Sequence, residues 1–68
     1  MPLPKEILDS VEEDIKEADS AIAELRDVVT DMRLAGMDTT KQEAELDKLT
    51  DEIRKLRIFD ARQRAKSE

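Results

Sequence analysis

The stretch LAGMDTTKQEAEL, residues 34–46, decides how this chain folds. It holds Gly36, the only glycine among 68 residues, followed directly by Met37 and then by DTT at 38–40. Glycine readily adopts the left-handed backbone that ends many helices, whereas Asp and Thr side chains accept hydrogen bonds from the first amides of a new helix. Thr40 with Glu43, and Thr39 with Gln42, each fit a capping box. Stop and start signals this close together predict a turn between two antiparallel helices.

Residues 31–42, which overlap this stretch, partly fit the loop of a calcium-binding EF-hand, with Asp31 at the first position and Gly36 at the sixth. The positions between them that should supply oxygen ligands are Arg33 and Ala35, and Gln42 stands where a glutamate closes the loop. Since an arginine repels a cation and calcium needs oxygen ligands, we expect a helix-capping turn here and no metal site.

Upstream of the turn, apolar residues recur at alternating spacings of three and four, which predicts a helix over about residues 4–35. With Leu8 as position a of a heptad, the a residues are Leu8, Ile15, Ile22 and Val29, and the d residues are Val11, Ala18, Leu25 and Met32. Position g is often apolar as well (Ile7, Ala21, Val28 and Ala35), with Asp14 as the exception. A stripe over a, d and g is wider than one partner helix requires and indicates a helix with more than one neighbour.

Downstream, a second helix is predicted from Thr40 to about residue 64. Its apolar residues Leu46, Leu49, Ile53 and Leu56 repeat the 3, 4, 3 spacing. Polar residues hold the outer positions of this ladder, namely Gln42, Asp60 and Gln63, while Ile58 and Phe59 lie beside it. We interpret this as a stripe that drifts off the seam between the helices; a polar layer or a metal site at one end is the alternative. The last, polar turns are expected to fray.

Charge favours the antiparallel pairing. Residues 5–19 hold seven acids against two lysines, a net of −5, and residues 54–66 hold six bases against one acid, a net of +5. A hairpin folded about residues 37–38 lays these segments together and places Ile22 near Ile53 and Val29 near Leu46. It leaves Leu3, Ile7, Leu8 and Val11 opposite polar residues. A single continuous helix is the alternative architecture, and the capping signals around Gly36 argue against it.

Composition excludes several classes of function. The chain has no histidine, cysteine, tyrosine or tryptophan, and 44% of its residues are charged. No imidazole or thiol is present for acid–base, nucleophilic or ligand chemistry, and no glycine-rich phosphate loop is present. We therefore expect a protein that is no enzyme and takes no cofactor and no metal. No run approaches the roughly 20 apolar residues that span a bilayer, so we expect no membrane partner and take the cytoplasm as the default location.

The surplus apolar surface predicts self-association. Two helices alone do not cover an a, d and g stripe, and an all-α hairpin that dimerises into a four-helix bundle is the simplest solution, with a different protein as the other candidate for the second position. The residues expected to form the self-association or partner interface are Leu3, Ile7, Leu8, Val11, Ile15, Ile22, Leu25, Val29, Leu46, Leu49, Ile53, Leu56 and Phe59. The function expected is that of a non-catalytic interaction or scaffold module.

Two alternatives use the charged faces instead. The basic end of the second helix would suit the phosphates of RNA or DNA, and its candidate contacts are Arg54, Lys55, Arg57, Arg62 and Arg64. The acidic outward face of the first helix would suit a basic protein. The overall charge of −6 weighs against nucleic acid, because the acidic helix neutralises the basic segment.

Overall fold

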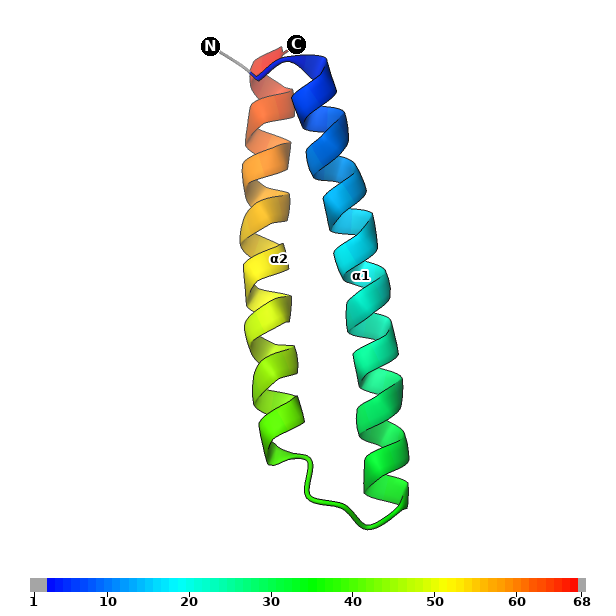
Figure 1. The fold of residues 1–68 in the computed structure, drawn as a ribbon. Helices are drawn as coiled ribbons and strands as arrows, with labels where there is room; N and C mark the ends of the chain where they lie inside the picture. The colour runs from blue at the N-terminus through cyan, green and yellow to red at the C-terminus, as the bar shows by residue number, and fades with distance from the viewer. Residues whose placement is uncertain (1–2, 68) are drawn as a thin grey trace.

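Two long helices joined by a short turn make up the protein. The computed structural model describes residues 3–67, with α1 at Lys5–Leu34 and α2 at Thr40–Ser67. The helices run antiparallel and side by side, so the start of α1 and the end of α2 lie at the same end of the molecule (Figure 1). The molecule measures 51 × 15 × 12 Å. The predicted helical hairpin is confirmed, and the continuous single helix is wrong.

The first helix begins one residue later than the sequence suggests. Pro4 is extended (φ −57°, ψ 152°) and lies just outside α1. Its carbonyl oxygen accepts hydrogen bonds from the amides of Ile7 and Leu8, each at 3.1 Å. Proline suits this place because it has no amide of its own that would need a partner.

Gly36 ends α1 in the way its position predicts. Its φ is +79°, in the left-handed region. The Gly36 amide donates to the Arg33 carbonyl at 2.9 Å, and the Met37 amide donates to the Met32 carbonyl at 2.9 Å. These two bonds form a Schellman motif, which satisfies carbonyl groups that the last turn of a helix would otherwise leave unpaired. The chain is thereby turned back toward its own first helix.

The second helix starts with different partners from the two predicted capping boxes. The Asp38 carboxylate accepts from the backbone amide of Thr40 at 3.0 Å and from its hydroxyl at 2.7 Å. The buried Thr39 hydroxyl donates to the Glu43 carboxylate at 2.8 Å, so Thr39 pairs with Glu43 and not with Gln42. Asp38 bonds two residues along because a short acidic side chain reaches its own following turn most easily. At its other end α2 continues to Ser67, past the predicted end near residue 64.

The core lies along position a of α1. Leu8, Ile15, Ile22 and Val29 are 3–7% exposed and form the buried row. The facing residues of α2, namely Leu46, Leu49, Ile53 and Leu56, are half-buried. Val29 and Leu46 line one surface hollow, and Ile22 and Ile53 line the next, so the predicted register is confirmed.

Two expectations about the ladder ends are wrong. Leu8 was expected among the uncovered residues and is only 4% exposed, because the Arg64 side chain reaches across the seam and donates to the Leu8 carbonyl oxygen at 3.1 Å. Asp60 was expected to have left the seam, yet its side chain is 15% exposed while Phe59 and Ile58 are 42% and 49% exposed. The heptad therefore continues in α2 through polar residues, and Arg64 supplies the charge that lets Asp60 remain there.

Candidate interaction surface

One side of the seam between the helices is closed by ion pairs. Arg64 of α2 pairs with Glu12 of α1 at 3.3 Å, Arg57 pairs with Asp19, and Arg33 of α1 pairs with Glu43. All six residues occupy heptad position e, and we call this side the ion-pair face. The three pairs lie along the whole hairpin and have the same register, in which the paired residue numbers are symmetric about residue 38. The complementary charge blocks seen in the sequence are thus used within the chain.

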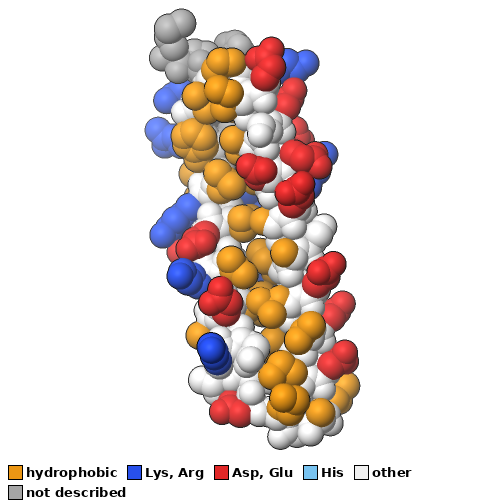
Figure 2. Space-filling view, in the orientation of Figure 1, with side chains coloured by type: hydrophobic (Ala, Val, Ile, Leu, Met, Phe, Trp, Pro, Cys, Tyr) orange, Lys and Arg blue, Asp and Glu red, His pale blue; other side chains and the backbone are white. Residues whose placement is uncertain are grey.

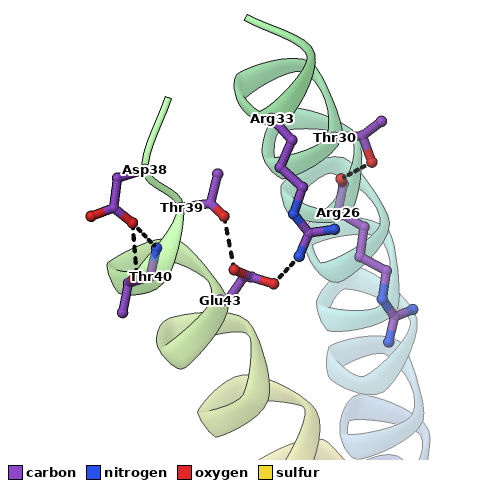
Figure 3. Close-up of polar contacts among 7 residues, drawn as sticks. All are labelled: Arg26, Thr30, Arg33, Asp38, Thr39, Thr40 and Glu43. Atoms are coloured by element: carbon purple, nitrogen blue, oxygen red, sulfur yellow. Dashed lines mark hydrogen bonds and ion pairs between the residues drawn. The ribbon is translucent and has the colours of Figure 1, made fainter. Parts of the chain in front are cut away.

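Near the turn the ion-pair face joins the start of α2. The Glu43 carboxylate accepts from the Thr39 hydroxyl with one oxygen and from the Arg33 guanidinium with the other (Figure 3). The bond between Arg33 and Glu43 links the last turn of α1 to the first turn of α2. Capping and interhelical pairing therefore share one carboxylate, which ties the local turn to the register of the hairpin.

At the opposite end Arg64 is the central group. Its guanidinium donates to the Asp60 carboxylate at 3.0 and 3.2 Å, to the Leu8 carbonyl and to Glu12. The hydrogen bonds to Asp60 are the main cause that holds the pKa of Arg64 above its usual value. A planar guanidinium reaches three partners in different directions, which a lysine ammonium would do less well.

The other side of the seam is mainly apolar and only partly covered. It consists of residues at positions d and g, and we call it the open face; its apolar members are Ile7, Val11, Ala18, Ala21, Leu25, Val28 and Met32 of α1 with Leu49, Leu56 and Phe59 of α2. Its polar members are Asp14 of α1 with Gln42, Glu45, Glu52, Gln63 and Lys66 of α2. The d residues are half-buried, whereas Ile7, Val28 and Phe59 at position g are 47%, 50% and 42% exposed. Apolar side chains run along this face from one end of the hairpin to the other (Figure 2).

Helix geometry explains why d and g of both helices share a side. In a helix, e and b lie on one flank of the a–d seam, and g and c lie on the other. The hollow at the turn end is lined by Thr30, Arg33, Glu43 and Asp47, which are b and e residues of both helices. Since these flanks face the same way, the g and c flanks of both helices face the opposite way. The hairpin therefore has one closed side with ion pairs and one open side, on which the apolar residues lie mainly along α1.

The surface area agrees with a missing neighbour. The hairpin exposes 5278 Å² of accessible surface. A compact monomer of this mass is expected to expose about 4,400 Å². The excess of about 900 Å² is close to the roughly 800 Å² that each partner buries in a stable interface of standard size.

The predicted interface residues divide into three groups. Leu8, Ile15, Ile22 and Val29 are buried within the hairpin; Leu3, Val11, Leu25, Leu46, Leu49, Ile53 and Leu56 are half-buried; Ile7 and Phe59 are exposed. Val28 is exposed at position g, as Ile7 and Phe59 are, but the predicted interface does not include it. The signal that would have included Val28 is the width of the stripe itself.

Four of the five predicted nucleic-acid contacts are paired with carboxylates. Arg57 and Arg64 belong to the ion-pair face, and Arg54 and Lys55 pair with Asp51 at 2.9 and 3.2 Å. These two bases hold the pKa of Asp51 below its usual value, chiefly through the hydrogen bond from Arg54. Only Arg62 of the five has no carboxylate partner within the part of the chain that the structure describes. The basic segment is thus largely neutralised where it lies.

Over residues 3–67 no group of three or more carboxylates is placed to hold a metal ion, and no helix is long and apolar enough to cross a membrane. No family model, curated protein or solved structure matches this chain.

Proposed function

We propose that this protein is a non-catalytic interaction or scaffold module that self-associates through its open face into a four-helix bundle. The observation that carries the proposal is the contrast between the two sides of one seam. The side with the e residues is closed by three interhelical ion pairs, while on the other side the apolar d residues are only half-buried and the apolar g residues are exposed. Burial of apolar surface contributes about 25 cal/mol of favourable free energy for each Å², so association through such a face is strongly favoured.

A four-helix bundle is the arrangement that suits this distribution. Each helix in such a bundle has two neighbours, and its a, d and g or e residues together face them. α1 has one neighbour in α2 and an apolar flank left for another, represented by Ile7, Ala21 and Val28. A second hairpin supplies that neighbour and has the same need.

The alternative of nucleic-acid binding is less well supported. Phosphate binding requires cations that are available to the ligand. Arg57 and Arg64 would have to leave Asp19 and Glu12, and these pairs contribute to closing the hairpin. A different protein on the open face, or a basic protein bound to α1, would be favoured if the purified protein does not self-associate.

The test is the mass in solution by light scattering, measured over about 1–200 µM with helicity recorded on each sample. We expect a helical dimer whose dissociation follows mass action. Val28→Asp on the open face is expected to keep helicity at high concentration and to shift the mass toward the monomer. Ile7→Asp is expected to do the same to a smaller extent.

Leu34→Asp is the control, because Leu34 is 83% exposed and lies at position f, away from the open face. It introduces the same charge but is expected to leave the mass unchanged. A wild-type protein that stays helical and monomeric at 200 µM contradicts self-association. If the Val28→Asp dimer had the same dissociation constant as the Leu34→Asp dimer, this placement of the interface would be wrong.

A further inference from the structure

The charged residues that border the open face are arranged in two rows of opposite sign. On α1 the c positions Glu17, Glu24 and Asp31 form an acidic rim, and on α2 the c positions Lys41, Lys48, Lys55 and Arg62 form a basic rim. Figure 2 shows the two rims along opposite edges of the apolar surface, with acidic side chains along the α1 edge and basic ones along the α2 edge, where some acidic side chains also lie.

These rims differ from the ion-pair face in having few partners. Within the described chain, Lys55 pairs with Asp51, and the remaining members of both rims form no ion pair. The e residues Glu12, Asp19 and Arg33 are all paired across the seam. The rims are too far around each helix to meet within one hairpin, since the open face lies between them. Their complementary charge is available only to another molecule.

We propose that two copies pair with their turns at the same end, so that α1 of each copy packs against α2 of the other. This inference rests on the proposed function and specifies its partner as a second copy of this chain. The two-fold axis then runs parallel to the helices. The acidic rim of one copy lies along the basic rim of its partner on both sides of the dimer. With the turns at opposite ends, α1 would face α1, and the two acidic rims would lie together.

The register follows without further adjustment. A two-fold axis along the helices leaves each residue at its own height, so α1 meets the partner's α2 at the heights at which it meets its own α2. Ion pairs at 12 with 64, 19 with 57 and 33 with 43 fix those heights. Glu24 then lies level with residue 52, between Lys48 and Lys55, and Glu52 is itself an acidic member of the open face. By the same symmetry Glu17 lies between Lys55 and Arg62, and Asp31 lies between Lys41 and Lys48.

The core layers match in the same arrangement. By the register of the ion pairs, Leu25 and Leu49 lie within two residues of the same height in the hairpin, and the two-fold axis brings the corresponding pair of the second copy to that height. Four leucine side chains then form one apolar layer, which suits close packing. The net negative charge near the turn opposes this arrangement. Charges more than about 8 Å apart are largely screened at physiological salt, whereas the rim residues are neighbours.

A distance between spin labels tests the arrangement. The chain has no cysteine, so Leu34→Cys places a single nitroxide at the turn end of each copy and Ala65→Cys places one at the other end. Both residues are exposed at position f. With turns together, each labelled dimer gives a distance below about 35 Å; with turns apart, 30 helical residues separate the labels by about 45 Å or more. Long distances for both variants overturn the inference and leave the proposed function standing.

Charge reversal gives an independent measurement. When Glu17, Glu24 and Asp31 are changed together to Lys, we expect the dissociation constant of the dimer to rise on the order of 100-fold. The six acidic rim side chains of the dimer then become basic and lie beside the basic rims. Adding Lys48→Glu, Lys55→Glu and Arg62→Glu to the same chain is expected to restore the dimer. Glu6, Glu13 and Asp27 changed to Lys on the outward f face are the control and are expected to have little effect. A dimer unaffected by the rim reversal contradicts the inference, whereas a wild-type monomer contradicts the proposed function itself.

Discussion

The two sides of this hairpin have the same heptad repeat and different surroundings. The a row of α1 is buried and the d row is half-buried, although both rows consist of aliphatic residues. The difference arises at the neighbouring positions. Charged e residues pair across the seam and cover the a row, whereas apolar g residues, most of them on α1, extend the d row into solvent. Whether a residue of the repeat is core or interface is therefore decided by the residue beside it.

The largest effect is expected from placing a charge in the covered row. Ile22 is 6% exposed, and Ile22→Asp buries an unpaired carboxylate in the apolar core of the hairpin. We expect loss of helicity by circular dichroism at every protein concentration. Leu25 lies about one helical turn further along, in the half-buried d row, and Leu25→Asp is expected to leave a helical monomer at low temperature. If the two variants were equally unfolded, the distinction between the two rows would be wrong.

Gly36→Ala changes the turn that brings the two e rows together. The space around Gly36 is open, so the cost comes from the backbone, whose φ of +79° is unfavourable for any residue with a Cβ atom. We expect the free energy of unfolding to fall by about 1–2 kcal/mol, measured by urea titration. Gly36→Asn is expected to cost less, because asparagine tolerates this conformation better. Equal losses would argue against a backbone origin.

Asp60→Leu would extend the covered row with an apolar residue. Asp60 lies at position a of α2, largely buried, at the height of Ile15. A leucine would pack there, and Arg64 would keep Glu12 and the Leu8 carbonyl as partners. We expect the midpoint of thermal unfolding to rise by about 5 °C. Asp60→Asn, which keeps the size and removes the charge, is expected to lower it.

Acidification is expected to have the smallest effect. Hydrogen bonds from the Thr40 hydroxyl and amide hold the pKa of Asp38 below its usual value of 3.8, and Arg54 and Lys55 do the same for Asp51. A carboxyl group whose pKa is lower in the folded state stabilises the fold above its unfolded pKa and loses that contribution as the pH falls through the folded value. Stability should therefore decline below about pH 4.

Asp38→Asn isolates one part of this decline, since the amide keeps an acceptor oxygen and does not titrate. We expect the variant to show a shallower loss of the thermal midpoint between pH 5 and pH 2 than the wild type. An unchanged slope would mean that Asp38 contributes nothing to the pH dependence, which would then belong to Asp51.

Much of this fold is predictable because it is encoded locally. The spacing from Leu8 to Met32 predicts α1, and Gly36 predicts its end, since helix periodicity and a left-handed cap depend on nearby residues alone. The register was predictable too, because charge blocks and apolar ladders agree. The capping partners were not: Asp38, Thr39 and Thr40 are all competent, and only the position of Arg33 on the other helix decides that Glu43 bonds Thr39.

The sequence by itself determined the two helices, the turn and the antiparallel register, because each depends on spacing along the chain. The tertiary structure decided which side of the seam is closed. Leu8 and Asp60 show this most clearly, because the sequence predicts neither of them to be covered. Arg64, near the end of α2, covers Leu8 through a hydrogen bond to its carbonyl oxygen and pairs with the Asp60 carboxylate. A contact between residues 56 positions apart depends on how two surfaces meet, and no local pattern specifies it.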